Sequence, residues 1–496
     1  MSSRPNILIF MTDQQRADVV EADHPCLTPN LDRFAADGVR FRRVYTPTAH
    51  CCPARATFFT GLYPSRHGIF NNIFNNAAIN TELAAGVQTF GEQLKASGYR
   101  MAFSGKWHVS TTEDPKDRGW EELFTTATGA THHGRSVDDW RALAVDPEPS
   151  ERERGTVQRP GWGPFTVYKT LPDGGPKGYE EDKDYKVIQA AVDALPDLAG
   201  GDEPWALWVG PIGPHDPFHV PEKFVKMYDP STIELPASYA DRMEDKPRIY
   251  QRMRRQFWDQ LNEDEVRESI AHYWAYCTMM DALFGEVLDA LEATGQADNT
   301  LVLFLSDHGD YCGDHGLYLK GVPAFREAYH VPCVARWPNG IAQPDRAVDE
   351  FVTLADFAPT FLELAGIEPS PELTGRSIAP FLRGETPEEW TDAFFSQMNG
   401  VELYYSQRVV ATKEYKYVYN GFDFDELYDL RSDPHEMRNV AEDPAYDDIK
   451  RGLVQRMWRF AAAQDDRIFN PYGTVAFAPW GPADGLREGR GEGVTR

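Results

Sequence analysis

One cysteine stands where the sequence predicts the start of a helix, in the run His50-Cys51-Cys52-Pro53-Ala54-Arg55. Proline is favoured in the first turn of a helix, so Pro53 predicts a helix that runs through Phe59. The N-terminus of a helix attracts anions, and the guanidinium of Arg55 would strengthen that attraction. A thiol in this position is a candidate nucleophile. The alternative for Cys51 is a buried structural thiol beside a helix that begins with proline.

Two further clusters offer ligands that suit a metal cation. Asp13 and Gln14 follow the first apolar run of the chain, and Asp307 and His308 follow another apolar run near residue 300. Carboxylate and amide oxygens bind hard divalent cations, and imidazole binds transition metals. Taken alone, the first pair is as readily a helix cap, and the second pair, which precedes a glycine, is as readily a turn.

Basic side chains follow two other apolar runs. Lys106 and His108 stand two residues apart after the run Arg100–Ser104, so both can face one side of an extended chain. His215 follows another such run, and Lys320 lies a short distance beyond the Asp-His pair. A single histidine is structural more often than functional. The joint occurrence of all five clusters is harder to explain by structure alone.

Short apolar runs alternate with helical patterns over roughly the first 370 residues. This alternation predicts the α/β class, with a mainly parallel (mixed) central sheet sandwiched by helices. Ligands bind beyond the carboxyl ends of the strands in such sheets, so the five clusters would meet in one crevice. The predicted strands are Asn6–Met11, Val39–Val44, Arg100–Ser104, Trp205–Gly210, Leu301–Ser306 and Val331–Trp337. The predicted helices are Asn30–Gly38 (capped by Asn30 and stopped by Gly38), Thr89–Ala96 and Glu263–Ala293.

The character of the sequence changes after residue 375. Alternating stretches at Ala393–Ser396, Ser406–Thr412 and Tyr415–Tyr419, followed by a helical pattern over Tyr446–Gln464, predict a small C-terminal α+β domain with an antiparallel sheet. We therefore divide the chain into a large domain (residues 1–375), a small subdomain (376–470) and a tail rich in Gly and Pro (471–496). We expect the tail to pack on a neighbouring subunit of a homo-oligomer. A truncation at Asn470 that leaves the oligomeric state unchanged would contradict this.

Two segments without a clear period, residues 70–80 and 125–186, are predicted to be loops. Long loops in compact domains are often lids or binding loops, so we expect both to shape the pocket. His132 and His133 are candidates for its lining, or are solvated loop histidines.

The composition is that of a globular protein: 42% of the 496 residues are hydrophobic and 26% are charged. Lys and Arg total 50 and Asp and Glu total 77, so the net charge is −27. Such a surface repels nucleic acid and anionic membranes, and an anionic ligand would need a locally basic pocket. The sequence carries no membrane-spanning run and no signal-peptide pattern, so we expect a cytoplasmic protein. Its six scattered cysteines are then expected to be mostly free thiols.

In this order, the clusters resemble the type I sulfatases of the alkaline phosphatase superfamily. The family signature Cys-x-Pro-x-Arg stands here as Cys51-Cys52-Pro53-Ala54-Arg55, followed by the run Thr60–Gly68. The resemblance continues through Gly105–His108, Pro214–Pro217 and Ser306–Gly309, and extends to Leu427–Leu430 with Asp433-Pro434. It therefore covers nearly the whole chain. It implies a sulfuric ester hydrolase, similar to arylsulfatases, that acts on a small-molecule or carbohydrate sulfate ester.

The resemblance also implies that a maturation enzyme oxidises Cys51 to formylglycine (3-oxoalanine), whose hydrate is a geminal diol. One diol oxygen attacks sulfur and gives a covalent sulfated intermediate, and the other drives the release of sulfate. The resemblance implies one divalent cation, usually calcium, with manganese or magnesium as alternatives. Its implied ligands are Asp13, Gln14, Asp307, His308 and the modified Cys51.

The remaining residues of the motifs receive roles by the same resemblance. Arg55 would stabilise the diol, and His108 would be the base in the breakdown of the intermediate. The sulfate and the leaving oxygen would be bound by Lys106, Lys320 and His215.

Three positions depart from the common sulfatase pattern. Many sulfatases have Asp where this chain has Gln14, and Asn where it has His308. The pair found here resembles phosphonate monoester and phosphodiester hydrolases of the same superfamily, and in part choline sulfatases. The imidazole of His308 favours manganese, and Ala54 replaces the usual Ser of the modification signature.

The Lys106 and His108 pair follows the sulfatase pattern, so a sulfatase is the prediction. A phosphonate monoester or phosphodiester hydrolase is the alternative on the same machinery. A non-catalytic binding protein with an unmodified Cys51 is the alternative of another class. The sequence leaves open whether the ester is a sugar, aryl or alkyl sulfate.

Overall fold

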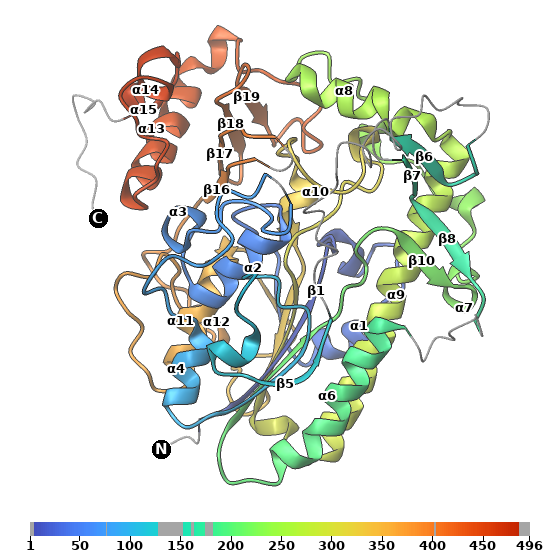
Figure 1. Ribbon diagram of the computed structural model, residues 1–496. Coiled ribbons are helices and arrows are strands. Elements are labelled where there is room, and N and C mark those ends of the chain that lie inside the picture. Colours follow the sequence, from blue (N-terminus) through green and yellow to red (C-terminus); the bar gives the residue numbers. More distant parts are fainter. Residues whose placement is uncertain are drawn as a thin grey trace.

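A sheet of eight strands forms the centre of the molecule in the computed structural model, which describes residues 4–75, 77–126, 152–159, 163–173, 182–400 and 403–485 (Figure 1). The strand order is β14-β2-β13-β11-β1-β9-β4-β5. Strand β13 runs antiparallel to its neighbours β11 and β2, and the other neighbouring pairs are parallel. The bounds are β1 Asn6–Thr12, β2 Val39–Phe41, β4 Arg100–Gly105, β5 Glu121–Thr125, β9 Trp205–Gly210, β11 Thr300–Ser306, β13 Cys333–Arg336 and β14 Arg346–Val348.

Helices cover both faces of this sheet, and each face has its own hydrophobic core. Side chains alternate along a strand, so Leu8 and Phe10 of β1 lie in one core, and Ile7 and Ile9 lie in the other. The first core is covered by α1 (Pro29–Ala36), α6 (Lys183–Ala199) and α9 (Glu263–Ala293), on the right in Figure 1. The second is covered by α2 (Cys51–Thr60), α4 (Phe90–Ala96) and α11 (Phe357–Leu364), on the left. The predicted α/β class is thereby confirmed.

Two predicted strands are each split in two. Residues 39–44 form β2 and then β3 (Val44–Tyr45), and residues 331–337 form β12 (His330–Val331) and then β13. Strands β12, β3 and β15 (Val352–Thr353) make a separate three-stranded sheet. Pro332 lies between β12 and β13, and proline cannot donate a hydrogen bond to a sheet, which explains the second break.

The predicted cap of α1 was wrong. The helix begins at Pro29 with Thr28 as its N-cap, because proline is favoured at the first helical position. Asn30 lies inside the helix instead, and its side chain donates to Asp281 of α9, 3.0 Å away. Asn30 therefore joins two helices that cover the same face of the sheet.

The segment predicted as a long loop, 125–186, contains regular structure where it is described. Strands β6 (Thr156–Arg159) and β7 (Gly163–Thr166) form a hairpin, and β8 (Tyr168–Leu171) pairs with β10 (Phe218–Pro221). Their short, charged stretches lack the apolar alternation that predicts a strand. His132 and His133 lie outside the described residues.

The C-terminal part holds the predicted antiparallel sheet. Its strands, in spatial order, are β16 (Phe394–Met398), β17 (Gln407–Ala411), β18 (Tyr415–Asn420) and β19 (Glu426–Asp429), and helix α13 (Asp447–Ala463) packs on them. The described part of the tail lies against α13 of the same chain, since the Trp458 indole donates to the carbonyl of Trp480 over 3.0 Å. The remaining helices are α3 Pro64–His67, α7 Glu222–Val225, α8 Arg248–Gln256, α10 Arg326–Tyr329, α12 Ala379–Leu382, α14 Thr474–Phe477 and α15 Pro482–Gly485.

Among the described helices, none combines the length and the apolar character that crossing a bilayer requires. The six cysteines are buried, free thiols.

Candidate active site

The carboxyl ends of four neighbouring strands bring the predicted residues to one edge of the sheet. Asp13 follows β1, Lys106 follows β4, His215 lies beyond β9, and Asp307 follows β11. Backbone hydrogen bonds continue past the strand ends and fix these positions. They join the amides of Asp307, Lys106 and Asp13 to the carbonyls of Thr12 (3.3 Å), Gly210 (2.8 Å) and Gly213 (3.2 Å), respectively.

A compact group of potential metal ligands lies at this edge. The ligand atoms of Asp13, Cys51, Asp307 and His308 all lie within 4.8 Å of one another, and all four residues are buried. His308 Nε2 is 3.1 Å from Cys51 Sγ, and Nδ1 lies 2.9 Å from the Gly309 carbonyl, to which it donates. That bond leaves the Nε2 lone pair for a cation. Burial lowers the pKa of His308, which favours the neutral imidazole that metal binding needs.

Arg55 balances the charge of the buried carboxylates. Its Nε donates to Asp307 Oδ2 over 2.8 Å, and another guanidinium nitrogen donates to Asp13 Oδ2 over 3.2 Å. A third bond, of 3.0 Å, joins Arg55 to the Lys106 carbonyl. Burial raises the pKa of Asp13, but the charges of Lys106, His215 and Arg55 outweigh it and hold that pKa well below its usual value. The carboxylate is therefore ionised and ready to bind a cation.

Helix α2 carries both Cys51 and Arg55 into the site. Its N-cap, His50, is extended, and Cys51 is the first helical residue. Cys51 Sγ lies 3.7 Å from Asp13 Oδ1. Arg55 is one turn further along, on the face of the helix that points at the strand ends. The helix ends at Gly61, which has φ of 70°, a conformation that favours glycine.

Gln14 lies at the border between the metal-ligand group and the basic residues. The Lys320 ammonium donates to its side-chain oxygen, and its side-chain nitrogen donates to Asp310. Lys320 Nζ also lies 2.8 Å from His215 Nε2. Gln14, Lys320 and His215, all predicted from the sequence, thus lie together, and the side-chain oxygen of Gln14 points to Lys320.

Lys106 and His108 reach the site by different backbone conformations. The Lys106 ammonium pairs with Asp13 directly after β4. His108 has φ of 61° and is not in an extended strand, and its ring stacks on Phe74 at 5.0 Å. Burial and the charges of Lys106 and Arg55 lower the pKa of His108 well below its usual value. The imidazole is therefore neutral and able to accept a proton.

Four polar residues near the site were not singled out by the sequence. Asp310 accepts from Gln14, and burial, helped by Asp216, raises its pKa to about 7. The Asn72 side chain accepts from the amide of Cys52 over 3.2 Å. The others are His50, the N-cap of α2, and Asp184, which accepts from the amides of Ile212 (2.6 Å) and Gly213 (2.8 Å) before His215. His50 adjoins the cysteine motif and could have been noticed; Asp184 has no local signal.

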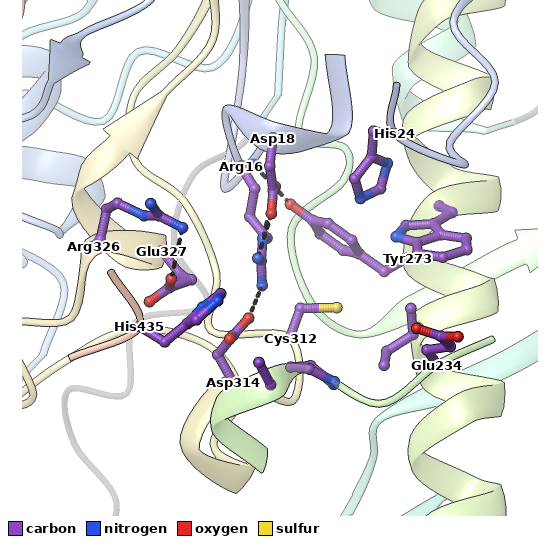
Figure 2. A pocket seen from close by; sticks show the side chains of 14 residues that line it. Arg16, Asp18, His24, Glu234, Tyr273, Cys312, Asp314, Arg326, Glu327 and His435 are labelled. Carbon is purple, nitrogen blue, oxygen red and sulfur yellow. Dashed lines mark hydrogen bonds and ion pairs between the residues drawn. The ribbon is translucent and has the colours of Figure 1, made fainter. Parts of the chain in front are cut away.

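A separate pocket of about 220 Å³ lies beside the segment that follows Gln14 (Figure 2). In it, Arg16 is held between Asp18 and Asp314. Tyr273 separates this pocket from the metal-ligand group, because its hydroxyl accepts from the Arg16 amide and donates to the Gln14 carbonyl. The pocket is lined by none of the sequence-predicted site residues, and its ion pairs support the chain that carries Asp13.

Two family models match the chain. The model described as Sulfatase matches residues 5–367, which include every predicted site residue. The model described as N-sulphoglucosamine sulphohydrolase, C-terminal, matches residues 313–463, which include the antiparallel sheet.

Individual proteins are similar over nearly the full chain. Choline-sulfatase from Rhizobium meliloti (strain 1021) is 31% identical over 466 residues, which cover 89% of this chain and 83% of that protein. Delta 4,5-hexuronate-2-O-sulfatase from Bacteroides thetaiotaomicron is 28% identical, over 90% of this chain and 86% of that protein. Among solved structures, the phosphonate monoester hydrolase from Silicibacter pomeroyi has a TM-score of 0.76 and 25% identity, and covers 93% of this chain and 96% of its own.

Proposed function

Because this chain belongs to the sulfatase family, whose members are sulfuric ester hydrolases, we propose that it cleaves sulfate monoesters at the edge formed by β1, β4, β9 and β11. The observation that carries the proposal is the buried group of Asp13, Cys51, Asp307 and His308, with Arg55 bridging the two carboxylates. Lys106, Lys320 and His215 add the positive charge that an anionic ester needs on a chain of net charge −27.

The ligand set fits a divalent cation. Asp13 and Asp307 offer hard carboxylate oxygens, and His308 offers an imidazole nitrogen whose tautomer is set by Gly309. Gln14 would complete the set through its side-chain oxygen, in place of its bond to Lys320. We propose one cation, calcium, with manganese or magnesium as alternatives. When bound, it supplies positive charge for the sulfate oxygens.

The nucleophile in this proposal is Cys51 after oxidation to formylglycine by a maturation enzyme. The hydrated aldehyde offers two hydroxyl groups, of which one attacks sulfur and the other allows sulfate to leave. Arg55, one turn along α2, would hold the diol by hydrogen bonds.

The remaining residues would bind the ester and move protons. Lys106 and Lys320 would contact sulfate oxygens. His215 Nδ1 donates to the Asp216 carbonyl, 2.7 Å away, and its Nε2, which faces Lys320, would donate to the leaving oxygen when the ring is protonated. His108, a neutral imidazole with Nδ1 free of hydrogen bonds among the described residues, would accept the proton that the diol loses.

Mass spectrometry of the Cys51 peptide, combined with hydrolysis of 4-nitrophenyl sulfate, tests this function. We expect a loss of about 18 mass units relative to cysteine, the exchange of thiol for aldehyde. We also expect sulfate release by the wild type and none by Cys51→Ala. Unmodified cysteine with no hydrolysis of any ester would instead support a non-catalytic binding protein.

A phosphonate monoester or phosphodiester hydrolase is the second candidate. The observations in its favour are Gln14 and His308 in the metal-ligand region, and the similarity to the phosphonate monoester hydrolase structure. Turnover of 4-nitrophenyl sulfate against 4-nitrophenyl phenylphosphonate separates the two. The sulfatase proposal predicts the larger kcat/KM for the sulfate, and the reverse order would favour the second candidate.

A further inference from the structure

His50 is fixed in place at the border of the active site. It directly precedes Cys51, and its backbone is extended as the N-cap of α2. The segment before it is anchored to the C-terminal sheet: the Thr48 hydroxyl donates to the Gln397 carbonyl of β16 over 2.7 Å, and the Gln397 amide donates to Pro47 over 2.9 Å. The backbone of His50 therefore links helix α2 to a segment that is anchored on strand β16.

The His50 ring is buried, yet it lacks hydrogen bonds. Only 3% of the residue is exposed, and neither ring nitrogen has a hydrogen-bond partner within the described part of the chain. Burial lowers the pKa of His50 to about 3, and the side chain of Asn72 next to the ring opposes this shift without meeting hydrogen-bond geometry at either nitrogen. Buried polar atoms are almost always paired, and an unpaired one is costly. Two unpaired nitrogens on one buried ring therefore indicate a ligand.

Another buried histidine close by gives the contrast. His67 is fully buried, and both of its ring nitrogens are paired: Nε2 lies 3.0 Å from the Thr57 hydroxyl, and Nδ1 accepts from the Ile69 amide over 3.1 Å. A histidine that serves packing in this fold thus finds internal partners. His50 does not.

The charged neighbours of His50 locate its ring within the site. The groups that act on it electrostatically are Lys320, His308 and His215. The ring therefore lies near Lys320 and His215, and His215 would hold the leaving oxygen of the ester.

We propose that His50 binds a hydroxyl group on the alcohol part of the substrate, next to the ester oxygen. An imidazole has one N–H donor and one lone pair, and a hydroxyl offers the matching acceptor and donor. An ester with an apolar leaving group would leave both ring nitrogens unpaired, and sites of this kind discriminate strongly against such analogues. The preferred substrate is then the sulfate ester of a polyhydroxylated alcohol, the class to which sugars belong. This inference rests on the proposed function.

The test compares two esters that differ by one hydroxyl: catechol monosulfate and phenyl sulfate. The readout is the ratio of their kcat/KM values in the wild type, in His50→Phe, which has a ring without polar atoms, and in His50→Asn. We expect the wild type to favour catechol monosulfate about tenfold or more, the equivalent of about 1.4 kcal/mol. The ratio should collapse toward one in His50→Phe and be intermediate in His50→Asn.

Two controls separate this contact from folding and from the reaction class. His435→Phe changes an exposed histidine on another surface and should keep the wild-type ratio. Catechol and phenol are also supplied as methylphosphonate monoesters. A comparison of sulfate with phosphonate esters then tests the reaction class, and a comparison of catechol with phenol esters tests the contact with His50. If His50→Phe unfolds, calorimetric binding of the two sulfates to Cys51→Ala and to Cys51→Ala/His50→Asn gives the same comparison. Equal preference for both esters in the wild type, or an unchanged ratio in the His50 variants, would overturn the proposal.

Discussion

At the scale of single residues, the site is a balance of buried charges. Asp13 and Asp307 are fully buried beside each other, and Arg55 and Lys106 are the cations that contact them directly. A buried carboxylate without a partner is strongly unfavourable, so removal of the Arg55 or Lys106 side chain should lower the stability of the fold as well as the activity.

Arg55→Ala should therefore unfold more easily than the wild type, by about 3–5 kcal/mol in metal-free buffer. A divalent cation binds the same two carboxylates and should restore part of the loss, about 2.7 kcal/mol at a hundredfold excess over its Kd. The measurement is thermal unfolding of both proteins with EDTA and with calcium or manganese. Equal stability of the two proteins in EDTA would show that Arg55 does not compensate the carboxylates.

At the scale of elements, the ends of parallel strands set the positions of the catalytic groups. Gly105 ends β4 with φ of 112°, and a Cβ on it would lie 2.1 Å from the Gly210 carbonyl oxygen of β9. The next residue, Lys106, donates its amide to that same carbonyl over 2.8 Å. The close approach of two strand ends thus aims the Lys106 side chain at Asp13.

Gly105→Ala should destabilise the protein by about 2–5 kcal/mol, through the forbidden contact and the positive φ. It should also lower kcat/KM by about a hundredfold, because a shift of about 1 Å at Lys106 misplaces the sulfate contact. Unfolding midpoints and ester hydrolysis check both effects. The control is Gly452→Ala, in the exposed middle of α13 with no neighbour within 4 Å, which should gain about 0.5–1 kcal/mol.

Asp184 connects helix α6 to the segment that precedes His215, and its titration predicts a pH effect. Burial, with help from Asp182, raises its pKa from 3.8 to about 7. Between these two values the folded chain holds a proton that the unfolded chain has lost, so this group's contribution to stability falls as pH rises from about 4 to 7. The total change is at most about 4 kcal/mol.

The Asn side chain of Asp184→Asn cannot titrate. The difference between the unfolding midpoints of the wild type and this variant should therefore become less favourable to the wild type as the pH rises from 4.5 to 7.5. The comparison is thermal unfolding of both proteins at the two pH values. A constant difference between them would mean that Asp184 keeps the same charge in the folded and unfolded chain.

The sequence predicted the elements whose signals are local. The runs that form β1, β9 and β11 are continuously apolar because both faces of the sheet are covered, and α9 has a long helical period. The hairpin β6–β7 is short and polar, and the segment that leads into it is held to α9 by contacts such as Arg152 with Glu265, which no local pattern reveals. The motif residues were found because each follows a strong strand signal. His50 and Asp184 were not found from the sequence. The unpaired ring nitrogens of His50 and the hydrogen bonds that Asp184 accepts from Ile212 and Gly213 depend on how the whole chain folds.

At the scale of the whole molecule, metal binding and folding should be coupled. The ligands come from three segments, after β1, at the start of α2 and after β11, so a bound cation holds Asp13 and Cys51 together with Asp307 and His308, about 250 to 300 residues further along the chain. Removal of the cation should therefore affect the entire large domain and not one loop.

Incubation with EDTA should lower the unfolding midpoint, and added calcium or manganese should restore it, with a gain of about 2.7 kcal/mol at a hundredfold excess over the Kd. Asp307→Asn weakens the ligand set and should lose most of this dependence. Calorimetric scans of both proteins, with and without metal, give the answer. A wild type that is indifferent to chelation and to added metal would argue against the cation site.

The central position of β1 has a consequence for biosynthesis. It precedes every other described strand in the sequence, and its neighbours in the sheet begin only at Trp205 and Thr300. At roughly 5–20 residues per second, translation takes roughly 15–60 s to reach the second of them. During that interval the thiol of Cys51, buried in the finished protein, belongs to an open nascent chain. An enzyme that oxidises Cys51 while translation continues therefore meets an accessible peptide and needs no opening of the completed fold.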